Sequence, residues 1–171
     1  MTSTCTAPFY GKYRGKVETT LDPLGLGRVQ VSVPDVTGGD LMAWAMPCMP
    51  GAGPGVGFFA VPPKGARVWV EFERGDPNYP IYSGGFWDVG DTPVPLGPTQ
   101  PVTKVWAGEN FRVELNDAPG LGALTLTITT ASGDAVISAD ATTMGLSFSN
   151  NSVMVDSTGV TINNGNLKVL P

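Results

Sequence analysis

The chain has 171 residues, of which 23 are glycine and 16 are proline, and it contains no histidine. This composition excludes long helices, and it also excludes histidine-based catalytic triads, histidine general bases and histidine metal ligands. A formal net charge of -5 and a sequence pI of about 4.5 leave no chain-wide basic surface for nucleic-acid phosphates. We therefore expect no cofactor, no metal and no nucleic-acid partner.

Short alternating segments predict a small β-barrel in the first half of the chain. The expected strands cover residues 13–20, 27–33, 41–46, 66–73 and 79–84. In the fourth of these, Val68, Val70 and Phe72 share one face, and Trp69 lies among charged residues on the other. Five short strands in about 75 residues fit an OB-fold barrel, although the strand count alone also allows an SH3-like barrel.

The uncharged segment 41–63 is long enough to span a bilayer. Its five prolines and its glycines at 51, 53, 55 and 57 favour a strand followed by an apolar loop instead. The loop Gly51–Gly57 lacks the Gly-Lys-Ser/Thr of a phosphate-binding loop, so we interpret it as a mobile or interface loop. The N-terminus has no apolar core of signal-peptide length, and secretory export is not expected.

Two features that could indicate chemistry have simpler interpretations. Glu71 and Glu73 share a strand face roughly 7 Å apart by strand rise, but exposed alternation explains them without a catalytic role. The two cysteines are too few for a disulfide framework, and Cys48 is expected to be buried as a small apolar side chain. No catalytic residue is therefore predicted.

The composition changes at residues 88–103, where four prolines predict an extended linker and a domain boundary. From residue 104 onward, short strands of Val, Ile, Leu and Thr each carry one narrow apolar stripe. The alternating positions are 111/113/115, 124/126/128, 146/148, 153/155, 160/162 and 167/169. Without helices to form a second layer, such stripes must be buried by copies of the same segment, and a trimeric β-prism meets that need. The alternative is an independent β-sandwich packed against the barrel.

Taken in order, the first-half motifs resemble the OB-fold domain of contractile-tail spike proteins. The matching features are a Gly-x-Val first strand, Asp22-Pro23, Gly27-Arg28-Val29, Pro34, Pro63-x-Gly65, Val68-x-Val70-x-Phe72-Glu73, Gly75-Asp76-Pro77, Pro80 and Gly84. This is the family of phage baseplate assembly protein V, related to the C-terminal spike of type VI secretion VgrG proteins, and the resemblance covers residues 11–87. The segment 156–162 is similar to the repeat-bearing β-helix that follows the barrel in such spikes.

The resemblance implies an all-β, non-enzymatic spike of a phage tail baseplate or a related contractile particle. Its expected parts are an N-terminal arm (1–10), an OB-fold barrel (11–87), a Pro-rich linker (88–103) and a triple-stranded, intertwined β-helix needle (104–171). It implies a homotrimer that pierces the target envelope, in transient contact with the target membrane, when the sheath contracts. Because only about ten residues precede the first strand, we expect docking on a separate hub protein. The protein is expected to be made in the cytoplasm without a signal peptide.

The chain departs from some relatives in two respects. No lysozyme domain separates barrel and needle, so no cell-wall hydrolase is implied. The His-x-His iron site found at some tips is excluded, because the chain has no histidine. The tip residues Leu167, Val169, Leu170 and Pro171 are therefore expected either to plug the needle or to be capped by a separate PAAR-type protein.

Several large aromatic side chains are candidates for assembly contacts. The simplest interpretation of Trp44, Phe58, Phe59, Trp87 and Trp106 is that they are core residues. Phe58 and Phe59 are adjacent, however, so in an extended segment they face opposite ways and at least one meets another surface. The predicted trimer or hub interface comprises Phe58, Phe59, Trp69 and Trp87. The alternative function is that of an OB-fold binding module for oligosaccharide or single-stranded nucleic acid.

Overall fold

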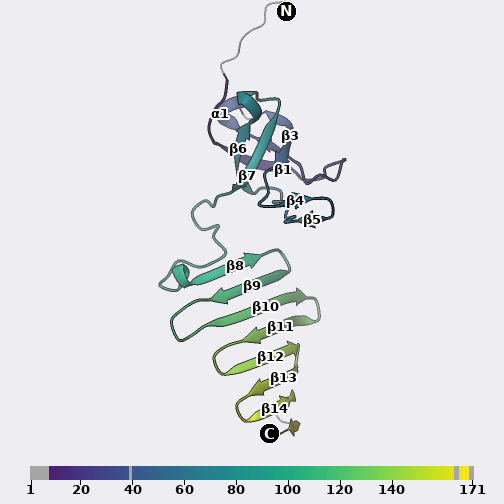
Figure 1. Cartoon of the computed structure of the whole chain (residues 1–171), viewed down its shortest axis with the longest axis vertical. Helices are drawn as coiled ribbons and strands as arrows, with labels where there is room; N and C mark the ends of the chain where they lie inside the picture. The colour runs from purple at the N-terminus through teal and green to yellow at the C-terminus, as the bar shows by residue number, and fades with distance from the viewer. Residues whose placement is uncertain (1–7, 39, 164–165, 170–171) are drawn as a thin grey trace, which may run out of the picture. The chain divides into compact units, whose positions relative to one another are not determined.

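The computed structural model describes residues 8–38, 40–163 and 166–169, and the chain divides into two compact units, residues 1–90 and 91–171. Both units are built from β-strands (Figure 1). The helical elements of the described residues are short: α1 (Pro34–Thr37) and the 3-10 turns η1 (Glu73–Gly75) and η2 (Gln100–Val102). The predicted all-β class is confirmed.

The first unit is a closed five-stranded barrel. Its strands are β1 (Tyr13–Thr19), β2 (Val29–Ser32), β3 (Leu41–Pro47), β6 (Arg67–Phe72) and β7 (Pro80–Gly85). They follow the order β1-β2-β3-β7-β6, and β6 pairs back to β1, so the ladder closes. The pair β3–β7 is parallel and the other pairs are antiparallel. The five strands agree with the predicted segments to within two residues, and the arrangement fits an OB-fold.

Two elements of this unit lie in segments that the sequence predicts as loops. Helix α1 begins at Pro34, which is tolerated there because the first helical N–H groups have no partner within the helix. It ends at Gly38, whose φ of 67° is accessible to glycine at little cost. The loop 51–57 forms a small hairpin of β4 (Ala52–Gly53) and β5 (Val56–Gly57). Both elements are too short to produce a periodic signal.

The uncharged segment therefore folds as β3 followed by the β4–β5 hairpin. Among the described residues, no helix has the length and apolar character needed to cross a membrane. The expectation that Cys48 is buried is wrong, because this residue follows the end of β3 and is exposed. Its backbone N–H still donates to the Tyr82 carbonyl at 2.9 Å.

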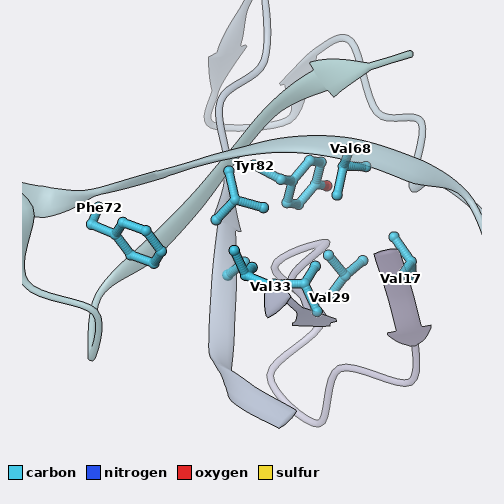
Figure 2. Packing of buried hydrophobic residues seen from close by; sticks show 9 residues of the cluster. Val17, Val29, Val33, Val68, Phe72 and Tyr82 are labelled. Carbon is cyan, nitrogen blue, oxygen red and sulfur yellow. The ribbon is translucent and has the colours of Figure 1, made fainter. Parts of the chain in front are cut away.

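The barrel core consists of inward-facing side chains from all five strands (Figure 2). They are Val17, Val29, Val31, Val33, Ala45, Val68, Val70, Phe72 and Tyr82. The predicted apolar face of β6 is thus confirmed. Tyr82 reaches its partner inside the core, where its hydroxyl donates to the Gly27 carbonyl at 2.7 Å, and burial raises the pKa of Tyr82 to about 12. Each polar group that enters this core is paired, as burial requires.

A glycine in β1 lets two walls of the barrel approach each other. A Cβ atom at Gly15 would lie 2.7 Å from a methyl carbon of Val70 and 3.4 Å from the Ser32 carbonyl oxygen. We expect Gly15→Ala to destabilise the barrel by about 1–3 kcal/mol through overpacking. Gly51→Ala is the matched control, because no atom lies within 4 Å of its Cβ position. Urea unfolding of both variants tests this, and equal midpoints would contradict the packing described.

The second unit is a single antiparallel sheet in which consecutive strands pair in chain order (Figure 1). The strands are β8 (Thr103–Ala107), β9 (Phe111–Asn116), β10 (Ala123–Thr130), β11 (Gly133–Ala139), β12 (Thr143–Phe148), β13 (Asn151–Asp156), β14 (Gly159–Ile162) and β15 (Leu167–Val169). The described part of this unit contains one sheet, not the two packed sheets of the sandwich alternative. Its backbone hydrogen bonds run between strands of the same chain.

Candidate assembly surfaces

The strand register places the apolar side chains of the second unit on one side of the sheet. Leu126 lies opposite both Val113 and Ile137, and Leu146 lies opposite both Ile137 and Val153. Directly opposed residues in antiparallel strands share a face. We call this side the apolar face, and its members include Trp106, Phe111, Val113, Leu115, Leu124, Leu126, Ile128, Ile137, Met144, Leu146, Phe148, Val153, Val155, Val160, Ile162 and Leu167.

This apolar face is not covered within the chain. No described residue of the second unit is fully buried, whereas the barrel has a dry core. Leu146, in the middle of the face, is 54% exposed. Around it lies a shallow hollow of about 500 Å³, lined by residues such as Leu126, Ile137, Phe148 and Ile162. Large exposed apolar surfaces of this kind are typical of protein or membrane interaction sites and of ligand-binding grooves.

The opposite side of the same sheet is mostly polar, although Val136 and Met154 also lie on it. The positions that alternate with the apolar face include Thr125, Thr127, Ser138, Ser147, Ser152 and Thr161. On this side, the Arg112 guanidinium donates to the Glu114 carboxylate at 2.6 Å, and to the Pro93 carbonyl at 3.0 Å. The sheet therefore has one side suited to water and one suited to burial.

Aspartate side chains close two of the hairpins of this sheet. Asp140 accepts hydrogen bonds from the backbone N–H and hydroxyl of Thr142 and from those of Thr143. These bonds, with those from Thr142 the largest contribution, lower the pKa of Asp140 to about 2. Asp156 accepts from the backbone N–H and hydroxyl of Thr158 in the same way. Such local bonds hold the turn and so help to fix the register on which the apolar face depends.

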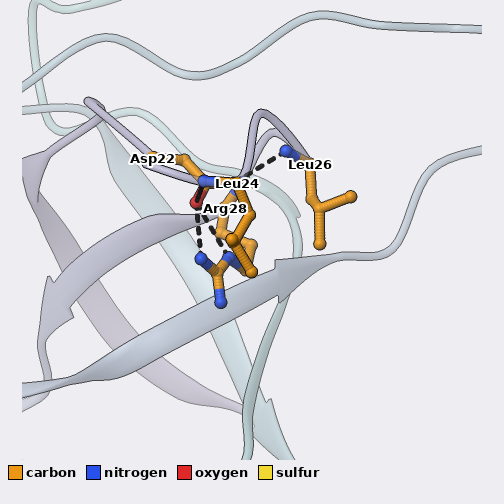
Figure 3. A network of polar contacts seen from close by, with 4 residues as sticks. All are labelled: Asp22, Leu24, Leu26 and Arg28. Atoms are coloured by element: carbon orange, nitrogen blue, oxygen red, sulfur yellow. Dashed lines mark hydrogen bonds and ion pairs between the residues drawn. The ribbon is translucent and has the colours of Figure 1, made fainter.

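In the barrel, Asp22 organises the long connection between β1 and β2 (Figure 3). Its carboxylate accepts from the backbone N–H groups of Leu24 at 3.0 Å, Leu26 at 2.8 Å and Arg28 at 3.2 Å. It also accepts from Nε of Arg28 at 3.0 Å and from Nη2 at 2.6 Å. The Arg28 guanidinium carbon lies 5.4 Å from the ring centroid of Trp44, which it faces. Only 4% of the Asp22 side chain is exposed.

This network makes the barrel sensitive to acid. The Arg28 side chain, and then the backbone N–H donors, hold the pKa of Asp22 well below its ordinary value of 3.8. A depressed pKa contributes stability above the unfolded-state pKa, and that contribution is lost as the pH falls through the folded-state value. We expect Asp22→Asn to lower the melting temperature at pH 7 by roughly 5–10 °C and to flatten its fall below pH 4.

Thermal unfolding between pH 2 and 7 provides the measurement for Asp22→Asn. Asp35→Asn is the matched control, because it removes an exposed carboxylate from the same barrel. If Asp22→Asn melts like the unsubstituted chain at pH 7 and keeps the same acid dependence, the network does not stabilise the barrel.

The four residues predicted for a trimer or hub interface do not form one cluster. Phe58 and Phe59 together line a hollow of about 350 Å³ beside the β4–β5 hairpin. Phe59 is 73% exposed and one edge of its ring covers Gly27, where a Cβ atom would lie only 2.9 Å away. Trp69 lies elsewhere, on β6 beside Phe86, and Trp87 is exposed. The core interpretation of Phe58, Phe59, Trp87 and Trp106 is therefore wrong, because all four side chains are at least half exposed. The role of Phe58, Phe59 and Trp87 at an interface stays a prediction.

The predicted tip is only partly within the described residues. Leu167 begins β15, lies opposite Ile162 and is exposed. Val169 ends β15 opposite Val160. Leu170 and Pro171 lie outside the described residues. Whether these four residues plug a needle stays a prediction.

Sequence reasoning missed part of the surface near Phe59. The β1–β2 connection exposes Leu21, Leu24 and Leu26, and Leu26 lines the same hollow as Phe58 and Phe59. The sequence does contain a signal for this exposure. The three leucines lie within four residues of the turn sequence Asp22-Pro23, and side chains on such a connection between strands usually lie at the surface.

A closed five-stranded barrel with these strand pairings belongs to the OB class, a scaffold that presents binding and assembly surfaces on its loops and outer strands. Residues 13–87, which hold all five strands of the barrel, match the family model of the type VI secretion system and phage-baseplate injector OB domain. Comparison with curated proteins finds no match to the chain. This family match supports a structural, baseplate-type role in a phage tail or injection machine.

Proposed function

We propose that this protein is the central spike of a contractile injection machine. In this proposal the second unit assembles with two other copies into a three-sided β-prism, with the three apolar faces turned inward. The barrel docks on a separate hub protein, and the prism presses on the target envelope when the sheath contracts. The match of the barrel to the injector family supports a role in an injection machine. The uncovered apolar face supports the association of several copies.

Three copies suit the apolar face for a geometric reason. The face belongs to one sheet, and the described part of its unit has no second layer, so the face needs a surface of the same kind to bury it. A closed ring of copies, each contacting the next through the same pair of surfaces, buries every apolar face and leaves none for further growth. A dry, continuous axis of packed Leu, Ile, Val and Phe side chains then provides the rigidity that a piercing rod needs.

Several features of the proposal concern partners outside this chain. The apolar hollow at Phe58 and Phe59 is a candidate contact for the hub or for a neighbouring copy. The end of the sheet near Leu167 is the proposed tip, either plugged by its own apolar residues or capped by a PAAR-type protein. No catalytic step is part of this function. Glu71, which shares a strand face with Trp69, is ion-paired with Lys12.

Imaging of the assembled particle tests the spike role. A small epitope tag added at the N-terminus, decorated with its antibody, is expected to label one end of the tube, beneath the sheath and baseplate. Label along the sheath, or its absence from purified particles that contain the other baseplate proteins, would contradict the proposal. The alternative, an OB-fold binding module, predicts saturable binding of a sugar or of single-stranded nucleic acid by the isolated chain.

A further inference from the structure

A groove on the outside of the barrel carries a charge pattern that the spike role does not explain. It has a volume of about 330 Å³ and lies within the first unit. Its walls come from β1, which supplies Arg14 and Lys16, from β6, which supplies Arg67, and from Phe86, which follows β7. Three cationic side chains thus converge on one groove of an acidic protein.

Arg14 is the most distinctive side chain of this groove. Its guanidinium carbon lies 5.2 Å from the ring centroid of Trp69 and 4.7 Å from that of Phe86. The centroids of the two rings are 4.8 Å apart, so both rings contact the same guanidinium. Stacking on the ring faces orients a guanidinium and leaves its N–H edges available for hydrogen bonds in the plane.

These N–H edges have no acidic partner among the described residues, since the structure pairs Arg14 with no carboxylate there. The neighbouring cations differ in this respect. Lys16 is paired with Glu18 at 3.3 Å, and Arg67 with Asp88 at 2.9 Å. Arg14 is therefore the cation of the groove with its charge still available.

The surrounding carboxylates limit what the groove can accept. Asp35 and Asp88 also line it, so a long polyanion such as a nucleic-acid backbone would be repelled by these two carboxylates. One or two carboxylates on an otherwise neutral chain avoid that repulsion. A carboxylate also matches the planar fork of a guanidinium, with two parallel N–H···O bonds.

We propose that this groove binds an acidic segment of a partner protein, with one Asp or Glu carboxylate of that segment held bidentately by Arg14. Trp69 and Phe86 position the guanidinium, and Arg14 supplies the available charge, because Lys16 and Arg67 are paired with Glu18 and Asp88. The groove thereby gives the barrel a polar, selective docking contact on a different part of its surface from the apolar hollow at Phe58 and Phe59. This inference does not depend on the spike role or on trimer formation.

The test uses the full chain with ¹⁵N-labelled tryptophan, whose four indole signals report separately. Trp69→Phe assigns the Trp69 signal. The probe is a Gly-Glu-Gly-Glu-Gly peptide that is acetylated at its N-terminus and amidated at its C-terminus, and the matched neutral peptide is Gly-Gln-Gly-Gln-Gly with the same two blocking groups. We expect the acidic peptide to shift the Trp69 signal saturably with a Kd of about 1 mM at low salt, and the neutral peptide to leave it unchanged.

Two substitutions connect the shift with Arg14. Arg14→Gln is expected to weaken binding about ten-fold, and Arg14→Lys nearly as much, because an ammonium lacks the planar fork. Lys64→Gln removes one positive charge from the barrel outside the groove, and it is expected to leave the Kd unchanged within two-fold.

Three results would overturn the proposal. They are no shift of Trp69 at 10 mM acidic peptide, equal binding by the Arg14→Gln variant, and tighter binding of a thymidine hexanucleotide than of the acidic peptide. The last result would assign the groove to nucleic acid, and it would favour the binding-module function over the spike.

Discussion

Replacing Leu146 by aspartate is expected to abolish assembly of the chain. Leu146 lies at the centre of the apolar face, opposite Ile137 and Val153. In a closed assembly of three copies, each copy would bury one unpaired carboxylate, and burial of an unpaired charge costs several kcal/mol. The cost is incurred three times in the same layer, so the expected product is monomer at micromolar concentration.

The adjacent residue provides the control for this prediction. Ser147 is on the same strand, but its side chain belongs to the polar side of the sheet, so Ser147→Asp adds the same charge where water remains. Light scattering is expected to give the unchanged oligomeric mass for Ser147→Asp and the single-chain mass for Leu146→Asp. Equal masses for the two variants would show that the apolar face is not the interface.

The second large effect concerns the barrel core. Val70 is fully buried and contacts the wall formed by β1, where Gly15 makes room for it. We expect Val70→Ala to lower the free energy of unfolding of the barrel by about 2–3 kcal/mol, because two buried methyl groups are lost and a cavity remains. For a small barrel this is a large fraction of the total stability.

Val89→Ala makes the same chemical change at a residue that is fully exposed. Urea unfolding, followed by the indole NMR signals of Trp44 and Trp69, measures the two variants on the barrel itself. A clearly lower midpoint is expected for Val70→Ala only. If both variants unfold at the midpoint of the unsubstituted chain, the inward face of β6 is not the core.

The barrel could be predicted because its signal is local and regular. Val68, Val70 and Phe72 alternate with polar or charged neighbours, and that pattern has one simple interpretation, a strand with one buried face. The turn after β6 has residues that favour turns: Gly75 adopts a φ of 78°, and Asp76 accepts from the N–H of Asn78 at 2.9 Å. Arg74 has a φ of 54°, a conformation that is uncommon for residues other than glycine and that the sequence therefore does not predict.

The second unit was only partly predictable. Strand β11 did not stand out, because Ala135 and Ala139 replace the large apolar residues that mark the other strands. The register that turns separate stripes into one apolar face depends on hairpins such as those closed by Asp140 and Asp156. Sequence alternation gives the face of each strand, whereas the alignment between strands follows from turn geometry.

The assembly surfaces of the barrel were the hardest to predict. Trp69 was expected at an interface, but its partners Arg14 and Phe86 lie on two other segments of the chain. Likewise, Asp22-Pro23 was matched only as a motif, whereas the five hydrogen bonds that Asp22 accepts, three of them from Arg28, depend on the folded loop. Contacts between distant segments follow from closure of the barrel, which no local pattern encodes.

The mass of the unsubstituted chain in solution tests the central claim most directly, because the apolar face cannot remain uncovered if the chain is a spike. Size-exclusion chromatography with light scattering at micromolar concentration is expected to give about three times the mass of the 17.8 kDa chain. A monodisperse, folded monomer under the same conditions would contradict the account.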